Sequence, residues 1–384
     1  MLNLKKWISI ESGAYLPNKS IGQMMKNREL GKRRRQYGDC TMTASNRNGS
    51  FTMAEKANLA NRFFPNRDDM ISVSQCTLLR CMHLNSDRLV SLSQDNILNF
   101  HLRNSSQHYE LLNRTDLPSA NSNVVDIASG SMGEHLAYTT LDAYVYYFHI
   151  DRIRQAARWN LFHAIQPIAA LRWNICSSIC FNMDDNYLLV VEAGGRISII
   201  STKEPSRYSF QAHQRDISAI SSSKVNPNIF YTGSPDGFWK VWDSRSNSNR
   251  VPVQMHASRS LYNVANIDSD SQDKYVVTSY TSGTRIDAWD LRFFGNQPFV
   301  IYRDEDEATT PFARGMSNKS DFLWRARFSP QITGHRYVYA NSSSGNIYIF
   351  DITTGETQRL HRHGTLICDS TWHPNISEIA CGTV

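Results

Sequence analysis

The sequence lacks the short motifs that mark most enzyme active sites. It contains no Gly-rich phosphate loop, no GxSxG nucleophile motif, no HExxH zinc motif and no nucleophilic cysteine with identifiable partners. Its longest apolar runs, such as residues 187–191, have the length of a strand and are far too short to span a membrane. Residues 1–13 have no long apolar region after their lysines, so we expect no secretion signal. These absences predict a protein without catalytic residues, cofactor or membrane segment.

Cysteine usage also argues against a disulfide framework or a zinc site. Seven cysteines, an odd number, stand at positions 40, 76, 81, 176, 180, 368 and 381, and no two CxxC pairs occur. This pattern favours reduced thiols in a cytosolic or nuclear protein. The sequence predicts no metal site.

Charge is mild over the whole chain and concentrated near the N-terminus. The formal net charge is +6, which is too small and too dispersed to indicate direct nucleic-acid binding. Residues 1–60 are rich in Asn, Ser, Lys and Arg and lack strand alternation, so they are predicted to form a mostly disordered arm. Within the arm, Lys32-Arg33-Arg34-Arg35 is a candidate nuclear import signal or, alternatively, a solvated charge cluster.

The most informative segment is residues 211–245, where four polar residues have the spacing of a WD repeat. His213, Thr232, Asp236 and Trp242 are expected to form a hydrogen-bond relay. In this relay Asp accepts from His, His bonds Thr, and the Thr hydroxyl accepts from the indole N–H, so each buried polar group has a partner. The alternative is four unrelated loop residues, but turn-forming residues such as Ser234-Pro235-Asp236-Gly237 fall where strands must reverse.

The pattern recurs along the chain, and a single repeat of this size cannot bury its own faces. The position of Trp242 is matched at intervals of 42 to 61 residues by His101, Phe148, Ile200, Trp289 and Phe350. This period predicts an all-β, seven-bladed WD-repeat β-propeller over residues 61–384, with an insertion at about 293–322.

The other repeats keep only parts of the relay. The residues that remain are Ser91 and Asp95 in the first unit, Asp142 in the second, and His256, Ser279 and Trp289 in the fifth. Gly194 and Gly283 stand where the third and fifth units should have a turn acid. We therefore expect these blades to hold their turns mainly by packing.

A seventh unit begins at His363, and the sequence stops inside its second strand. Propellers commonly complete the last blade with an N-terminal strand, and residues 69–74 or 7–10 could supply one. The alternative, which we favour, is that the C-terminus is truncated, because a blade with a missing strand has an open edge that can pair with other chains. His361 and His363 are a candidate metal pair, but His363 matches the structural position of His213, which favours a structural role.

Two consecutive units carry a Trp-Asp-x-Arg signature. It reads Trp242-Asp243-Ser244-Arg245 in the fourth unit and Trp289-Asp290-Leu291-Arg292 in the fifth. The signature resembles the box by which WD-repeat receptors bind the damage-specific DNA-binding protein 1 adaptor of cullin-4 RING ubiquitin ligases. A guanidinium fork suits acidic or carbonyl groups of a partner, whereas the alternative is that each Arg only bonds the Asp of its own blade.

A wider resemblance covers the chain from about residue 58 to the end. The sequence is similar to the WD-repeat protein 23 family of substrate receptors in segments that include Ala60–Asn66, Lys240–Arg245, Trp289–Phe294, Arg325–Pro330 and Asp369–Pro374. The resemblance implies adaptor binding through Asp243, Arg245, Asp290 and Arg292, polyubiquitination of bound targets, residence in nucleus and cytoplasm, and stress-response bZIP transcription factors among the targets.

Two parts of the predicted ring are candidate recognition elements for a partner. The insertion contains Asp304-Glu305-Asp306-Glu307, which is a candidate substrate-facing acidic run or simply a solvated loop, and the loops of the central pore are the other candidate recognition elements. The rival functional class is a scaffold that holds a protein complex together without joining a ligase.

Overall fold

The fold is seen in a computed structural model. It describes residues 78–105, 108–117, 123–141, 144–150, 161–165, 176–204, 206–246, 251–257, 263–281, 285–292, 298–303, 323–342, 345–352, 354–360 and 366–383. The predicted arm, the candidate N-terminal strands and most of the predicted insertion lie outside these residues. In the described part of the chain, no helix is long and apolar enough to cross a membrane.

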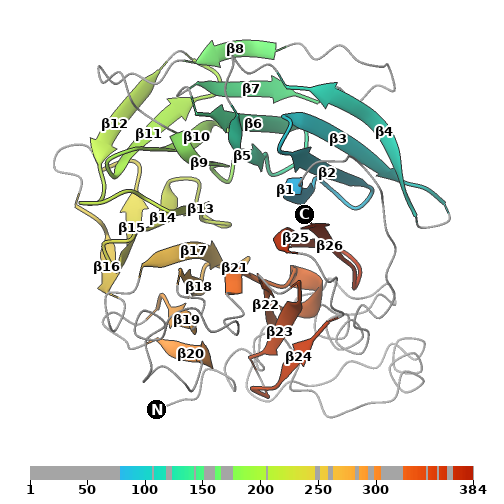
Figure 1. The fold of residues 1–384 in the computed structure, drawn as a ribbon. Helices are drawn as coiled ribbons and strands as arrows, with labels where there is room; N and C mark the ends of the chain where they lie inside the picture. Colours follow the sequence, from blue (N-terminus) through green and yellow to red (C-terminus); the bar gives the residue numbers. More distant parts are fainter. Residues whose placement is uncertain are drawn as a thin grey trace, which may run out of the picture.

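The described residues form an all-β propeller (Figure 1). Successive sheets are arranged around a central axis, with the first strand of each innermost and the fourth outermost. The one described helix is the short 3-10 turn η3 (Gln331–Thr333).

Six sheets are complete blades of four antiparallel strands, paired in chain order. Blades 1 to 3 contain β1 (Leu78–His83), β2 (Arg88–Ser93), β3 (Ile97–Arg103), β4 (Tyr109–Asp116); β5 (Val124–Ser129), β6 (His135–Thr140), β7 (Val145–His149), β8 (Leu161–Ile165); and β9 (Cys176–Phe181), β10 (Tyr187–Glu192), β11 (Arg196–Ser201), β12 (Arg207–Gln211). Blades 4 to 6 contain β13 (Ala219–Ser222), β14 (Ile229–Gly233), β15 (Phe238–Asp243), β16 (Gln254–Ala257); β17 (Val264–Ser269), β18 (Tyr275–Tyr280), β19 (Arg285–Asp290), β20 (Phe299–Arg303); and β21 (Leu323–Phe328), β22 (Tyr337–Ser342), β23 (Ile347–Asp351), β24 (Thr357–Arg359).

The predicted count of seven blades is not reached. The last sheet, which we call the closing sheet, has two strands, β25 (Ile367–Trp372) and β26 (Ile379–Thr383). It lies between blade 6 and blade 1 (Figure 1), so it occupies the place of a seventh blade with half the number of strands. The sequence pattern located this unit correctly, but the described chain supplies no third and fourth strand for it.

The apolar core lies between neighbouring blades. Each of six clusters joins residues from two successive sheets, from blades 1 and 2 round to blade 6 and the closing sheet. Between blades 4 and 5, for example, Trp239 packs with Val264, Tyr280 and Trp289. The six side chains predicted to recur at one position are all buried, namely His101, Phe148, Ile200, Trp242, Trp289 and Phe350. The prediction that these positions form the blade core is confirmed.

Polar contacts join the closing sheet to blade 1. Asp369 Oδ2 accepts from the Cys81 backbone N–H at 3.3 Å, and Arg103 pairs with Glu378 at 2.8 Å. His373 Nε2 lies 2.7 Å from the Ser86 carbonyl oxygen. Buried charges and polar groups contribute to stability only while their partners remain in place. This junction therefore depends on particular side chains.

We predict that Asp369→Ala lowers the free energy of unfolding by about 3 kcal/mol, because it removes a carboxylate that is 2% exposed and lies 3.1 Å from Arg327. Urea-induced unfolding measures the change. The matched control is Glu378→Ala at the same junction, whose side chain is 32% exposed and whose removal should cost about 1 kcal/mol or less. Equal losses for the two variants would contradict the importance of Asp369.

Candidate functional site

The candidate site is one rim of the ring, where the third strands of blades 4 and 5 end. β15 ends at Asp243 and β19 at Asp290, and each is followed two residues later by an arginine. Strands follow one another antiparallel in chain order in every complete blade, so all third strands run toward the same rim. Arg245 and Arg292 therefore leave neighbouring blades on one side of the ring.

Arg245 is held by the aspartate of its own blade. Its Nε lies 3.0 Å from Asp243 Oδ1 and its Nη2 lies 2.7 Å from Asp243 Oδ2, which is a two-pronged pair. These hydrogen bonds lower the pKa of Asp243 and raise the pKa of Arg245. The Arg245 side chain is 65% exposed, so the pair presents an arginine in a defined orientation to solvent.

Arg292 repeats this geometry with one additional contact. Its Nε and Nη2 donate to Asp290 at 3.0 and 2.9 Å, and Nη2 also donates to the Tyr275 hydroxyl at 2.6 Å. Its guanidinium carbon lies 5.1 Å from the centre of the Tyr275 ring. The side chain is 30% exposed, less than half the value for Arg245. Both arginines therefore bond the aspartate of their own blade, as the alternative to adaptor binding predicted. The Arg245 side chain is the more exposed of the two.

The hydrogen-bond relay of blade 4 anchors the strand that leads to Arg245. His213 Nδ1 lies 2.8 Å from Asp236, its Nε2 lies 2.8 Å from the Thr232 hydroxyl, and the Trp242 indole N–H donates to the same hydroxyl at 2.9 Å. The relay ties the loop before β13, the turn between β14 and β15, and β15 itself. Because Trp242 directly precedes Asp243, it also anchors the strand end that carries Arg245.

Blade 5 uses a different relay from the one expected. Trp289 donates to Thr278 at 3.0 Å, and Ser279 has no hydrogen-bond partner for its hydroxyl among the described residues. Thr278 donates to Tyr280, whose hydroxyl donates to Asp287 at 3.0 Å. The assignment of Ser279 to the relay was therefore wrong by one residue.

Blade 5 has a buried ion pair, and His256, contrary to expectation, does not take part in its hydrogen-bond network. Asp287 pairs with Arg285 at 2.7 Å, and both side chains are almost fully buried. His256 lies on β16 of blade 4 and stacks on Trp239 with 4.3 Å between ring centres, so it does not take the role of His213. Gly283, at the turn, is outside the described residues. A buried ion pair on the strands thus supplies the polar partners in this blade.

Blade 3 shows the same substitution of an ion pair for the relay. Glu192 and Arg207 are paired at 2.6 Å with side chains that are 0% and 3% exposed, and Ser198 bonds both. Gly194 and Gly195 form the turn with φ of 78° and 77°, which glycine adopts without the steric cost that a side chain adds. The expectation that this blade holds its turn mainly by packing was therefore incomplete, because hydrophobic spacing does not reveal such a pair.

Several predicted site residues cannot be placed. Lys32, Arg33, Arg34, Arg35, Asp304, Glu305, Asp306, Glu307, Asp142, His361 and His363 all lie outside the described residues. Ser91 and His101 of blade 1 are both buried, with 3.2 Å between the hydroxyl and His101 Nε2. The part of the chain that the structure describes holds no group of three His, Cys, Asp or Glu side chains able to bind a metal.

Comparison with known proteins identifies similar chains. This chain is 26% identical over 380 residues to the DDB1- and CUL4-associated factor 11 homolog of Caenorhabditis briggsae. The match covers 87% of this chain and 66% of that protein. The homolog of the same name from Caenorhabditis elegans is 25% identical over 338 residues, covering 77% of this chain and 57% of its own length. The LEC14B protein of Lithospermum erythrorhizon is 29% identical over 187 residues, covering 43% of this chain and 39% of that protein. No family model matches.

The resemblance to the WD-repeat protein 23 family is confirmed. It rests on two homologs named as associated with DDB1 and CUL4, which align with most of the chain. The chain spans less than two thirds of the length of these two relatives.

We predict that Trp242→Ala lowers the free energy of unfolding by about 3 to 5 kcal/mol, because it removes a buried aromatic side chain from between blades 3 and 4. Trp242→Phe is the matched control. It keeps most of the packing and loses the indole bond to Thr232, so it should cost about 1 kcal/mol for that bond plus a small packing loss. Chemical denaturation measures both, and equal effects would contradict a core role for the ring.

Acid is expected to weaken blade 4 through His213. Burial lowers the pKa of His213 from 6.5 to about 4, although Asp236 favours the charged form. The folded state therefore binds fewer protons than the unfolded state between these values, and the stabilisation present above pH 6.5 is lost as the pH falls toward 4. Between pH 7 and pH 5 this histidine should account for about 2 kcal/mol of lost stability. Urea titrations at both pH values should show a smaller loss for His213→Gln, and equal losses would contradict the assignment.

Proposed function

We propose that this protein is a non-enzymatic substrate receptor of a cullin-4 RING ubiquitin ligase. One rim of the ring, at Arg245 and Arg292, binds the damage-specific DNA-binding protein 1 adaptor, and other surfaces hold the target. Binding brings the target to the ligase for ubiquitination and proteasomal degradation. The observation that carries the proposal is the presence of two equivalent Asp–Arg pairs on one rim of neighbouring blades.

The geometry of the two pairs suits a docking surface. Each arginine is fixed by its aspartate, so little side-chain freedom remains to be lost when a partner binds. Arg245 can bond Asp243 and a partner at the same time, because a guanidinium has five N–H groups on three nitrogens and the bonds to Asp243 use two of these nitrogens. The names of the two nematode homologs support the choice of adaptor and ligase.

The finer features of the proposal come from the family resemblance, for residence and targets, and from the charge runs of the sequence. We infer residence in nucleus and cytoplasm, with Lys32-Arg33-Arg34-Arg35 as the import signal, and stress-response bZIP transcription factors among the targets. The acidic run Asp304-Glu305-Asp306-Glu307 is a proposed target-facing element for basic segments. We also propose that the closing sheet is the inner half of a seventh blade.

A scaffold that holds other proteins together is the second candidate. The bonds from Arg245 and Arg292 to the aspartates of their own blades favour it, because they give both arginines a structural role without any partner. Adaptor binding distinguishes the two functions, since a scaffold unrelated to the ligase has no affinity for the adaptor.

We predict that the purified protein retains the damage-specific DNA-binding protein 1 adaptor in a pull-down and that Arg245→Ala/Arg292→Ala abolishes retention. The double variant should keep the parent's free energy of unfolding to within about 1 kcal/mol, because exposed rim residues contribute little to stability. Circular dichroism and thermal unfolding provide the folding control.

A matched control for charge is Arg88→Ala/Arg114→Ala, which removes two arginines of blade 1 and should leave adaptor retention unchanged. Failure of the folded parent to retain the adaptor would exclude the receptor function and leave the scaffold. Equal retention by parent and Arg245→Ala/Arg292→Ala would place the adaptor contact elsewhere on the ring.

A further inference from the structure

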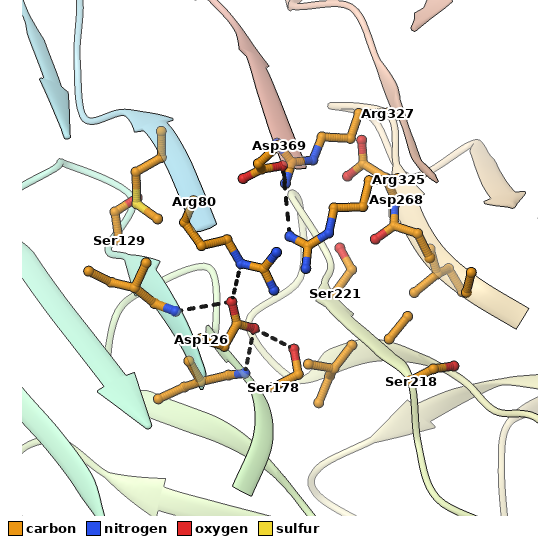
Figure 2. A pocket seen from close by; sticks show the side chains of 18 of the residues that line it. Arg80, Asp126, Ser129, Ser178, Ser218, Ser221, Asp268, Arg325, Arg327 and Asp369 are labelled. Carbon is orange, nitrogen blue, oxygen red and sulfur yellow. Dashed lines mark hydrogen bonds and ion pairs between the residues drawn. The ribbon is translucent and has the colours of Figure 1, made fainter. Parts of the chain in front are cut away.

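The central channel contains a polar cavity of about 260 Å³ lined by the first strands of the blades. Charged and hydroxyl side chains dominate its wall (Figure 2), and those labelled are Arg80, Asp126, Ser129, Ser178, Ser218, Ser221, Asp268, Arg325, Arg327 and Asp369. The strand pairing is irregular next to four of the charged positions, at Leu78/Arg80, Val124/Asp126, Trp324/Arg327 and Ile367/Asp369. Bulges of this kind redirect side chains, which explains how successive inner strands turn charges toward the axis.

The aspartates of the channel accept hydrogen bonds from neighbouring residues of the ring. Asp126 accepts from Arg80 Nε at 2.7 Å, from the Ser178 hydroxyl at 2.7 Å and from the Ile127 and Ile179 backbone N–H groups at 3.0 and 3.3 Å. Asp268 accepts from the Phe328 backbone N–H of the next blade at 3.0 Å. These carboxylates are therefore partly neutralised by donors of the wall, and they stabilise the contacts between blades.

The arginines retain donors that the ring does not use. Arg80 binds Asp126 through Nε, and its two terminal nitrogens have no hydrogen-bond partner among the described residues. Arg325 reaches Asp369 only at 3.8 Å, and Arg327 lies closer to that carboxylate at 3.1 Å. Figure 2 shows the guanidinium groups of Arg80 and Arg325 pointing into the same part of the cavity. The three arginines of the wall are matched by three aspartates, so an anion is favoured here by the unused donors of two neighbouring guanidinium groups and not by an excess of positive charge.

The backbone of Arg325 supports a functional role for this position. Its φ is 40°, in the left-handed region, although it lies inside strand β21. A non-glycine residue held in this region costs of order 1 kcal/mol or more, and such residues concentrate at binding sites. The other non-glycine residues with positive φ in the described chain are Asn, Asp or His, which tolerate it better.

We propose that this cavity binds an acidic side chain, Asp or Glu, of a segment of a partner protein, with Arg80 and Arg325 as the recognition residues. A carboxylate fits the fork of a guanidinium, and Ser221 adds a hydroxyl at the same wall. This proposal goes beyond adaptor docking and does not depend on it.

The direction of entry follows from the strand order. Arg80, Asp126, Arg325 and Asp369 are each the third residue of a six-residue first strand, which places them nearer the start of the strand than its end. First and third strands of a blade run parallel, so first strands start at the rim opposite Arg245 and Arg292. An acidic segment that enters from that opposite rim leaves the arginine rim free for the adaptor.

The test is isothermal titration calorimetry of the full chain with a short peptide of alternating glutamate and glycine and with the matched glutamine peptide. We expect the glutamate peptide to bind and the glutamine peptide to give no signal. Arg80→Ala/Arg325→Ala should weaken binding at least about tenfold, because charged hydrogen bonds are lost. Arg325→Ala alone should weaken it about fivefold or more, and it carries the test if loss of the Arg80–Asp126 pair prevents folding of the double variant.

The controls separate this site from the rim. Arg245→Ala/Arg292→Ala removes the same charge and should bind the glutamate peptide as the parent does, whereas the channel variants should still retain the adaptor if the parent does. Equal binding of both peptides, or unchanged affinity in a folded channel variant, overturns the proposal. A third titration uses inorganic phosphate: if it binds as tightly as the peptide with the same dependence on Arg80 and Arg325, the cavity is a site for a small free anion and the peptide proposal is wrong.

Discussion

A blade of this ring is stable only while both of its faces are covered by its neighbours. Its second strand is buried almost throughout, as in β18, where all six residues are buried. The six apolar clusters lie between sheets and not within them, so removing one blade exposes the faces of two others. At the junction of the closing sheet with blade 1, ion pairs and backbone bonds from Asp369, Arg103 and His373 supplement the packing. Ring closure is therefore sensitive to the loss of single polar groups.

The blades meet the requirement to pair their buried polar groups in different ways. Blade 4 uses the relay that ends at Trp242, blade 3 uses Glu192 with Arg207, and blade 5 uses a chain that begins with the ion pair of Arg285 and Asp287. In all three blades the network includes a residue of the third strand, namely Trp242, Ser198 and Asp287. In blades 4 and 5 the end of this strand carries an Asp–Arg pair, so the interior network determines where the rim arginines lie.

The two candidate binding surfaces share this framework and differ in chemistry. The rim pair at Arg245 is exposed and bonded to its own aspartate, which makes it a fixed surface feature. The channel arginines are enclosed, and their partners belong to neighbouring blades, as Arg80 and Asp126 show. Charges in an enclosed cavity are less screened by salt than charges on a rim, so the channel is the better place to select one ligand group. The opposite positions of the two surfaces allow both to be occupied at once.

The sequence by itself determined the all-β propeller class and the register of the core, although the predicted seven complete blades are six and a two-stranded sheet in the described residues. The spacing from His101 to Phe350 located the buried third-strand position in all six complete blades, because a repeat that packs only against its neighbours must keep the same apolar positions. The four residues around Trp242 were identifiable because each has a recognisable type and spacing. The same signals identified Arg245 and Arg292, which follow fixed positions of the repeat.

Only the tertiary structure decided which polar groups meet. Hydrophobic spacing could not show that Thr278 and not Ser279 bonds Trp289, since adjacent strand residues point to opposite faces and a placement error of one residue selects the wrong face. Nor could it bring Arg80 and Arg325 together, because they are far apart in the chain and meet only when the closing sheet joins blade 6 to blade 1. The spacing of residues within one repeat specifies a blade. Which side chains meet in the channel is decided only when the ring closes.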